Sequence, residues 1–261
     1  KSFRKFTPTY TADYVFTDDI NAYAKIANGY RAGGFNTRST IAGFGNGFNQ
    51  EDVRSTELGL KADLLDKKLR VNAAAFVNKY ANLQVDQARV PAFFTDTLNA
   101  GKATTKGMEL ELTARLAQGW MGNFFYTWLD AKLDSYIDNA QGVDVAALRH
   151  MPNAPRAQGG LGLRYQGDRT SAGRISASLD YKWQGEFYSG PKSNTHTSGY
   201  GVWNGRIQLG EIPLSRGSLR VALWGKNLAD RKYALATSDL TPVSAQFGEP
   251  RTLGVDVVYD F

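Results

Sequence analysis

Three features of the sequence predict an all-β fold made of antiparallel strands. Apolar and polar residues alternate along many segments, which is the period of a strand whose two faces meet different surroundings. Aromatic residues are plentiful, with 13 Tyr, 14 Phe and 5 Trp, and 27 glycines accompany them. No run of about 18 apolar residues occurs, so a transmembrane helix is not expected. Together these features are typical of an antiparallel transmembrane β-barrel, whose strands expose every second residue to lipid.

The last segment of the chain carries this pattern to its end. Its two aspartates, Asp256 and Asp260, fall on one face. The opposite face would carry alternate apolar residues, namely Leu253, Val255, Val257, Tyr259 and Phe261. A soluble protein usually covers an apolar strand at the edge of a sheet, or interrupts its pairing with other strands. The aromatic ending therefore favours a wall between lipid and water.

Earlier segments repeat the alternation. The clearest case opposes Asp180 and Lys182 to an apolar face of Ile175, Ala177, Leu179, Tyr181 and Trp183. Similar apolar faces are formed by alternate residues within 10–16, 58–64, 69–77 and 108–114. Segments 20–34 and 119–135 carry large side chains at both parities, so the pattern assigns them no face.

These segments and the turns between them predict about eleven strands. We expect them near 3–16, 20–34, 52–65, 68–86, 99–116, 119–135, 156–166, 173–188, 199–210, 217–233 and 246–261. Short connections are expected at 17–19, 65–67, 117–119, 166–172 and 211–216, and long ones at 35–51, 87–98, 136–155, 189–198 and 234–245. This alternation is typical of an outer-membrane barrel with short periplasmic turns and long external loops. Eleven strands form an open set with two edges, so we do not expect this stretch alone to form a closed pore.

Composition limits the chemistry. The chain has no cysteine, which excludes a disulfide framework, thiol catalysis and thiolate metal ligands. The formal charge of +6 and the isoelectric point near 9.4 suit nucleic acid, lipid A phosphates or an anionic solute. The basic residues are scattered, and no element for nucleic-acid recognition is present, so a nucleic-acid partner is not expected. Residues 1–6 resemble neither a signal peptide nor a cap, so we expect the chain to be a fragment.

Five stretches resemble segments of one family, the TonB-dependent outer-membrane receptors. They occur in family order over essentially the whole chain. The stretches are Tyr23–Asn36, Ser55–Lys61 with Leu69–Phe76, Gly101–Glu111, Gly225–Tyr233 and Gly248–Phe261. The resemblance implies a 22-stranded barrel around an amino-terminal plug with a TonB-contacting box. This chain has about half of those strands and no segment that resembles the plug, so residues 1–261 are expected to be the carboxyl-terminal part of the barrel.

The resemblance also implies a function. It is energy-coupled import of a scarce solute across the bacterial outer membrane. A ferric siderophore is the first solute we expect, and a saccharide or a cobalamin-like solute is the second. The implied partners are the TonB complex (through the missing plug), the small-molecule solute, outer-membrane lipid and lipopolysaccharide, and the barrel assembly machinery. No cofactor is expected. A passive porin-type channel is the alternative function.

Candidate solute-binding residues lie in the predicted external loops. Glycine and aromatic residues suit loops that close on a ligand, and arginine recognises anions bidentately. The candidates are Arg31, Phe35, Arg38, Phe44, Phe48, Phe93, Phe94, Arg149, His150, Tyr188 and His196. Tyr259 and Phe261 are candidates for the signal that the assembly machinery recognises, by family resemblance.

Each candidate has a plainer interpretation. The aromatic loops would simply pack on their own rim, the arginines would be solvated rim charges or contacts with lipid A phosphates, and Tyr259 and Phe261 would be lipid-facing aromatics. His150 and His196 lie in different loops without metal-ligand spacing, so no metal site is expected. Glu109 and Glu111 share a strand face as glycosidase carboxylates might, but a lumen-lining ladder explains them more simply. An enzyme is therefore not expected, and a Ser-His-acid lipase in the barrel wall would be the remaining enzymatic possibility.

Overall fold

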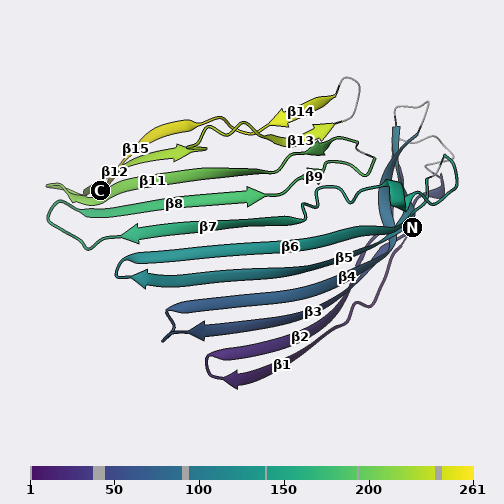
Figure 1. Cartoon of the computed structure of the whole chain (residues 1–261), viewed down its shortest axis with the longest axis horizontal. Coiled ribbons are helices and arrows are strands. Elements are labelled where there is room, and N and C mark those ends of the chain that lie inside the picture. The colour runs from purple at the N-terminus through teal and green to yellow at the C-terminus, as the bar shows by residue number, and fades with distance from the viewer. Residues whose placement is uncertain (1, 38–44, 90–93, 139, 193, 239–242) are drawn as a thin grey trace.

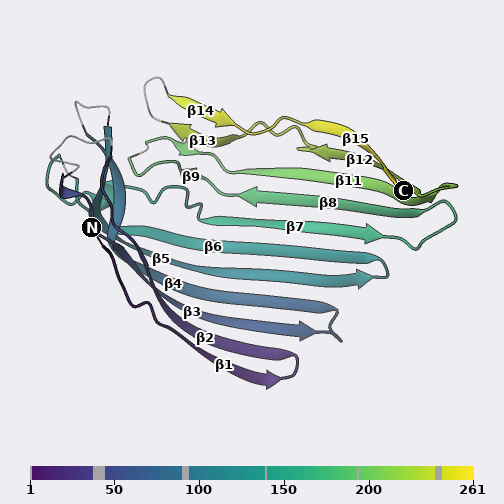
Figure 2. The same ribbon diagram turned by 180° about the vertical axis from the view of Figure 1, so that it is seen from behind.

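The computed structural model describes residues 2–37, 45–89, 94–138, 140–192, 194–238 and 243–261. Eleven strands of these residues form one antiparallel sheet (Figures 1 and 2). In sheet order they are β1 Thr9–Thr17, β2 Ile20–Arg31, β3 Glu51–Leu64, β4 Leu69–Arg89, β5 Phe94–Ala117, β6 Trp120–Tyr136, β7 Ala157–Gln166, β8 Arg174–Gln184, β11 Tyr200–Pro213, β12 Ser218–Lys226 and β15 Thr252–Asp260. The predicted all-β class and the eleven main strands are confirmed.

Four short strands and one 3-10 turn lie in the connections. β9 (Phe187–Tyr188) pairs with β10 (His196–Thr197), and β13 (Ala234–Ser238) pairs with β14 (Ser244–Phe247). The 3-10 turn, η1, spans Ala146–Leu148. No helix among the described residues is long and apolar enough to cross a membrane.

Cross-strand register gives the sheet one apolar and one polar face. Leu58 pairs with Ala75, Ala75 with Met108 and Met108 with Trp128, so these four side chains share the apolar face. Large side chains on this face are exposed, for example Ile207 at 62% and Leu58 at 61%. The polar face carries the intervening residues, such as Asp63 and Arg70, Lys61 and Asn72, and Glu109 and Glu111. We call these surfaces the apolar face and the polar face.

The register also assigns the two segments that the sequence left open. In β2, Tyr23 pairs with Gly59 and Lys25 with Glu57, which places both on the polar face. In β6, Phe124 pairs with Leu112 and Tyr126 with Leu110, which places these rings on the apolar face. Both strands therefore follow the same alternation as their neighbours.

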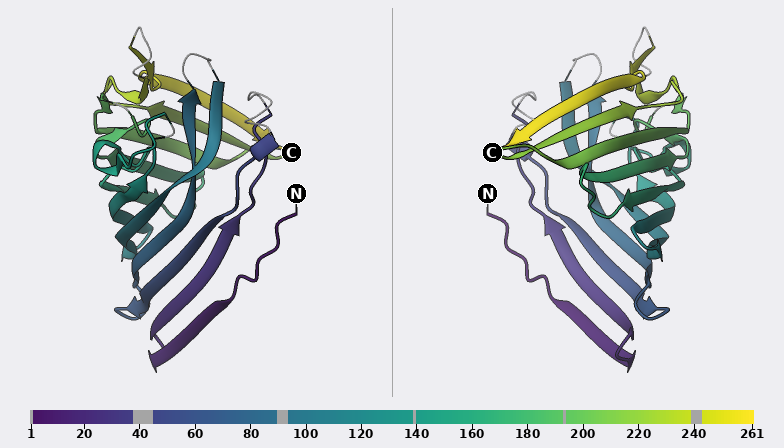
Figure 3. Two further views of the ribbon diagram at one scale, coloured as in Figure 1. Left: turned by 90° about the vertical axis from the view of Figure 1, so that its right-hand side faces the viewer. Right: turned by 90° about the vertical axis from the view of Figure 1, so that its left-hand side faces the viewer.

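The sheet is one layer thick and has two open edges. β1 pairs only with β2, and β15 pairs only with β12. Seen along the strands, the sheet is a curved wall whose amino- and carboxyl-terminal ends flank the open side (Figure 3). No second sheet covers the apolar face among the described residues, which distinguishes the fold from a sandwich. The expected open set of strands is confirmed, and the absence of pore formation by this stretch alone stays a prediction.

Short turns gather at one end of the sheet and long connections at the other (Figure 1). The β3–β4 turn is made by Leu65, Asp66 and Lys67, all with left-handed backbone at φ 54°, 54° and 62°. At the β5–β6 turn, Gly119 has φ 74°, and an added Cβ would lie 2.3 Å from the carbonyl oxygen of Gln166. Glycine is therefore required there. The chain also ends at this short-turn end of the sheet.

The long connection predicted at 87–98 is wrong. β4 continues to Arg89 and β5 begins at Phe94, with Asp86 paired to Thr97 in the extended hairpin. The hydroxyl of Thr97 donates to the Asp86 carboxylate at 2.6 Å. These outer ends of β4 and β5 turn away from the strand direction and cross the external end of the sheet (Figures 1 and 3). We call them the β4–β5 extension.

The strand expected at 217–233 is too long, because β12 ends at Lys226. Asn227 then adopts left-handed backbone with φ 47°. Its buried side-chain amide donates to the carbonyls of Arg231 (2.9 Å) and Glu249 (3.1 Å) and accepts from the Arg231 amide (2.8 Å). One side chain thus folds 227–231 into a turn and ties it to the chain entering β15. The strands expected at 3–16 and 246–261 are likewise shorter, beginning at Thr9 and Thr252.

Replacing Asn227 should loosen the connection between β12 and β15. Loss of three hydrogen bonds by a buried amide costs about 2–3 kcal/mol, and alanine adds about 1 kcal/mol of left-handed strain that glycine avoids. We expect N227A and N227G in the full-length protein to speed amide hydrogen exchange across 227–251, with N227A the larger effect. N153A is the control, because Asn153 is exposed and also left-handed at φ 53°. Unchanged exchange in both Asn227 variants would contradict this role.

Candidate ligand-binding surface at the external loops

The connections after β8 and β12 are held together by a cluster of hydroxyl groups. Thr197, which is fully buried, lies 3.1 Å from the Ser189 hydroxyl and 3.0 Å from the Thr237 hydroxyl. The Ser189 hydroxyl also accepts from the Thr237 amide at 3.0 Å. These contacts join the β9–β10 strands to β13, so side chains far apart in sequence are brought to one surface.

Asp138 anchors the loop between β6 and β7. Its nearly buried carboxylate accepts from the guanidinium of Arg149 and the ammonium of Lys192, each at 3.3 Å. The backbone amide of Ala140 donates to the same carboxylate at 3.0 Å. The Ala140 amide, followed by Lys192 and Arg149, holds the pKa of Asp138 below its usual range. The predicted residue Arg149 is thus an anchoring residue as well as a cation of the surface.

Three other predicted residues meet beside this anchor. The rings of His150 and Tyr188 are stacked with centroids 3.5 Å apart and planes 4° apart. His196 meets the same tyrosine edge-on at 6.3 Å, and its Nε2 lies 3.5 Å from Glu186. No group of three or more possible metal ligands occurs in the described part of the chain. The arrangement is an aromatic and imidazole platform.

A cleft of about 420 Å³ opens beside this platform. Its lining comes from the end of β6, the loop around η1 and the start of β9, and includes Ala131, Leu133, Arg149, His150, Arg156 and Tyr188. Arg156 was not among the sequence candidates. It is exposed, and its guanidinium forms no ion pair with the described residues. Its position directly before β7, at the loop end of the sheet, is the sequence feature that could have identified it.

The other predicted group lies on the loop after β2. Gly34 and Phe48 exchange backbone hydrogen bonds of 3.1 and 2.8 Å, which close the base of this loop. Asn36 exchanges two hydrogen bonds with the backbone of Thr97 on the β4–β5 extension, at 2.9 and 3.0 Å. Phe35 is 40% exposed, Phe48 is half-buried and Arg31 is exposed at the end of β2. Arg38, Phe44 and Phe93 lie outside the described residues, as does the side chain of Phe94.

The β4–β5 extension connects these two groups. It contacts the β2–β3 loop through Asn36 and Thr97, and the side-chain amide of Gln87 donates to the Ile137 carbonyl at 2.8 Å on the other side. The structure therefore brings Arg149, His150, Tyr188 and His196 together, whereas Arg31, Phe35 and Phe48 form a separate group.

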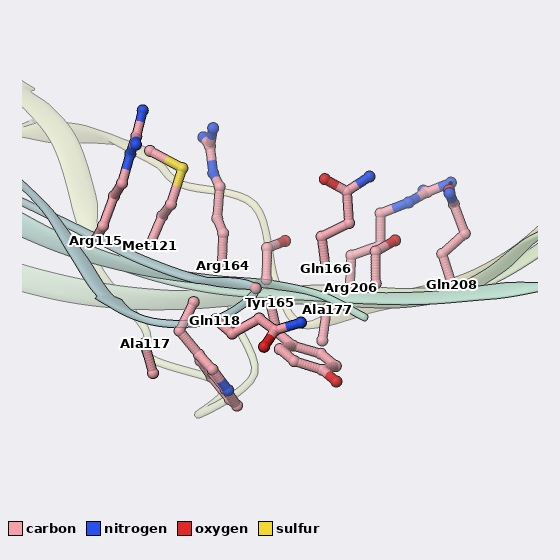
Figure 4. A pocket seen from close by; sticks show the side chains of 14 residues that line it. Arg115, Ala117, Gln118, Met121, Arg164, Tyr165, Gln166, Ala177, Arg206 and Gln208 are labelled. Atoms are coloured by element: carbon pink, nitrogen blue, oxygen red, sulfur yellow. Dashed lines mark hydrogen bonds between the residues drawn. The ribbon is translucent and has the colours of Figure 1, made fainter. Parts of the chain in front are cut away.

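A second cationic surface lies on the polar face near the short turns. Arg115 pairs with Met121, Met121 with Arg164, Arg164 with Ser178 and Ser178 with Arg206, so one row crosses five strands. Figure 4 shows Arg115 and Arg164 projecting from one side of the sheet and Ala117 and Tyr165 from the other. Arg206 is paired with Asp256 at 2.6 Å. Arg115 and Arg164 form no ion pair with the described residues, and sequence analysis did not single them out.

A one-layer antiparallel sheet with an exposed apolar face, short turns at one end and long loops at the other defines part of a transmembrane barrel wall. The family model described as TonB dependent receptor-like, beta-barrel, matches residues 1–228. The chain therefore belongs to the TonB-dependent receptor family, and it is part of an outer-membrane protein. Its apolar face is the lipid-facing side, and its polar face lines the lumen.

Individual proteins show the same similarity. The pesticin receptor of Yersinia pestis is 26% identical over 255 residues, which cover 96% of this chain and 35% of that protein. The ferric-pyoverdine M114 receptor PbuA of Pseudomonas sp. (strain M114) is 27% identical over 217 residues, covering 80% and 24%. The crystal structure of the ferric yersiniabactin uptake receptor FyuA from Yersinia pestis matches with a TM-score of 0.78 at 24% identity, covering 97% and 37%. The matched part of the chain thus spans 24–37% of the length of these relatives, and the members of this family are transport receptors.

The Asp138 anchor should respond to acid. Because the pKa of Asp138 is lowered in the folded loop, its stabilising effect is complete above the ordinary aspartate value and is lost as pH falls through the lowered value. A nitroxide on A147C in the full-length protein should stay equally immobile from pH 7 to about pH 4 and become mobile below that. In D138N the label should be mobile at every pH, because the population of the open loop should rise roughly tenfold over that of the wild-type protein at pH 7. An immobile label in D138N at pH 7 would contradict the anchor.

Proposed function

We propose that the full-length protein imports a ferric siderophore across the outer membrane. The relatives support this, since they are named as receptors for pesticin, ferric pyoverdine and ferric yersiniabactin. The observation that carries the proposal is the convergence of Arg149, His150, Tyr188 and His196, from separate connections, on one surface beside the cleft.

The chemistry of that cleft suits an anionic iron chelate. Many siderophores enclose Fe³⁺ in oxygen anions, so the complex presents a negative, partly aromatic surface. Arg156 supplies a guanidinium without an ion-pair partner among the described residues, and this group can donate two parallel hydrogen bonds to an anionic group. The stacked rings of His150 and Tyr188 supply a flat surface for an aromatic chelating group.

The loop after β2 would form a second contact region. In this proposal Arg31, Phe35 and Phe48 approach the solute from the other side of the β4–β5 extension, and Arg38 and Phe44 of the same connection also contribute. Phe93 and Phe94, which lie between β4 and β5 in sequence or at the start of β5, would contribute as well. The reciprocal hydrogen bonds of Gly34 with Phe48 and of Asn36 with Thr97 support a stable base for such a loop.

The remaining roles follow from the family. Residues 1–261 would be the carboxyl-terminal part of the barrel, and energy would come from the TonB complex through a plug outside this chain. Tyr259 and Phe261 would present the assembly signal, and the full exposure of the Phe261 side chain supports its recognition by a partner. In this proposal the protein is a transporter and not an enzyme, and Glu109 and Glu111 line the lumen beside Asn72, which donates to Glu111 at 3.4 Å.

Binding by the full-length protein tests the proposal. Ferric yersiniabactin, a ferric pyoverdine and a ferric catecholate siderophore are titrated by intrinsic fluorescence. We expect one to bind with submicromolar affinity. R156Q should weaken its binding about tenfold, equivalent to about 1.4 kcal/mol, whereas R216Q at a short turn should leave it unchanged. Y188A should weaken it by a similar factor, and Y188F, which keeps the ring, should not.

Uptake separates the receptor from the porin-type channel. Cells that express the full-length protein should accumulate radioactive iron from the bound chelate with saturation, and deletion of TonB should abolish this. Saturable binding by none of the three chelates, or accumulation that is linear in concentration and independent of TonB, would overturn the proposal in favour of a passive channel.

A further inference from the structure

Three cations lie at regular intervals along the polar, lumen-lining face of β7 and β8. Arg156 directly precedes β7, and the Leu129 amide donates to its carbonyl at 2.8 Å, so the hydrogen-bond ladder includes it. Lys182 of β8 pairs with Gly160, four residues further along β7, and Arg164 lies four residues beyond Gly160. Neighbouring cations therefore differ in depth by about 13 Å, at about 3.3 Å per residue. They extend along the wall from the loop end to the short-turn end, and we call them the cationic strip.

The charges of the cationic strip are not neutralised within the described residues. All three residues are exposed, and none of their side chains forms an ion pair there. The polar face of β7 and β8 carries one carboxylate, Asp180, on the row between Lys182 and Arg164. The other residues between the cations on this face are glutamine, serine and glycine. Three cations beside one carboxylate leave the strip with an excess of positive charge.

The polar face has a different charge pattern on β3–β5. Its carboxylates there include Glu57, Asp63, Glu109 and Glu111. Two cations among them are engaged, since Arg70 binds Asp63 at 2.7 Å and Lys61 lies over the ring of Tyr23, 5.7 Å from its centroid. The unpaired Arg115 of β5 lies in the same row as Arg164, at the short-turn end of the strip. An anion in the lumen is therefore attracted to the β7–β8 side of this wall.

The middle of the strip is flat and has an aromatic ring beside its lysine. Phe125, Gly160 and Lys182 are partners in one row across β6, β7 and β8. The half-buried ring of Phe125 lies over Gly160, where an added Cβ would be 2.6 Å from the ring. Gly160 and Gly162 add no side chain to the lumen, so a solute has room to pass over β7. A ring beside an ammonium group suits a chelate that is both aromatic and anionic.

The two ends of the strip meet the two surfaces described above. At the loop end, Arg156 lines the cleft beside His150 and Tyr188. At the short-turn end, Arg164 projects to the same side of the sheet as Arg115 (Figure 4). The strip therefore connects the candidate solute-binding cleft with the opposite end of the lumen.

We propose that the anionic chelate moves through the lumen along the cationic strip, from Arg156 past Lys182 to Arg164. The inference rests on the proposed import of an anionic chelate, and it adds the side of the wall and the residues along which that solute passes. Each cation attracts the oxygen anions of the chelate. Passage requires several sites of which none binds too tightly, and three separate single cations meet this requirement. Lys182 and Arg164 therefore act on the rate of transfer and not on binding at the external surface.

The attraction of anions to the strip is measured without a siderophore. Single nitroxides are attached to S178C on β8 and to A74C on β4, both on the polar face, in the full-length protein in bilayers. The relaxing agents are chromium oxalate, which is an anionic metal chelate, and a neutral nickel chelate. Relative to the nickel chelate, chromium oxalate should relax the label at position 178 at least roughly threefold more than the label at position 74. K182Q/R164Q should abolish this difference.

Uptake by cells then tests what the strip does. K182Q and R164Q should leave the affinity for the chelate unchanged, because neither residue lines the cleft. Each should lower the maximal rate of TonB-dependent uptake roughly fivefold, because the solute loses one attractive site on its path. K182R keeps the charge and should transport at the wild-type rate. K61Q is the matched control, since Lys61 lies in the same transverse row as Lys182 but on β3, and it should have no effect.

Equal relaxation of the two labels by chromium oxalate, unchanged uptake in both K182Q and R164Q, or an equal loss in K61Q would overturn the proposal. Entry of vancomycin into TonB-deficient cells that express K182Q/R164Q would also overturn it, because the cations would then hold the plug in place. Failure of the wild-type protein to bind any of the three chelates would instead overturn the proposed function. The spin-label comparison uses no siderophore, so it still decides whether the strip attracts anions.

Discussion

The structure depends on a wall one residue thick that separates two solvents. Between its two open edges the sheet pairs the backbone amides and carbonyls of neighbouring strands, as a membrane requires, because lipid offers no hydrogen bonds. Side chains then divide by parity alone, so Leu179 faces lipid while Asp180 faces the lumen. The described residues form no interior core that could stabilise this fold. Their buried apolar side chains are few and mostly small. The apolar face is stable only where lipid covers it.

Beyond the membrane boundary a different physical rule applies. There both faces meet water or other loops, and buried polar side chains replace the alternation as the source of order. Asp138, Thr197 and Asn227 each join segments that are distant in sequence, through a carboxylate, a hydroxyl and an amide respectively. The β4–β5 extension belongs to this region and connects the two groups of candidate solute-binding residues. The ligand-binding surface is therefore built on polar anchors, and the transmembrane wall below it is built on period-two patterning.

This change of rule explains what the sequence could predict. Alternation at Ile175–Trp183 and Leu253–Phe261 assigned the all-β fold and the faces of those strands, and the alternation of short and long connections assigned the two ends of the sheet. It did not predict the part of the β4–β5 extension beyond Asp86, because consecutive residues there, such as Thr95, Asp96 and Thr97, are polar on both faces. The end of β12 at Asn227 depends on a left-handed residue and on hydrogen bonds to Glu249, which pattern alone does not contain. Likewise, His150 and Tyr188 were recognised as separate loop residues, but their stacking and the exposure of Arg156 depend on how three loops pack.

Site-directed spin labelling of the full-length protein in bilayers tests the two-solvent wall most directly. Single nitroxides are placed at the neighbouring positions 179 and 180 of β8 and 207 and 208 of β11. The account predicts that labels replacing Leu179 and Ile207 are relaxed by oxygen dissolved in lipid, and that labels replacing Asp180 and Gln208 are relaxed more by a water-soluble nickel complex. Equal access of the nickel complex to all four labels would place water on both sides of the sheet and contradict the account.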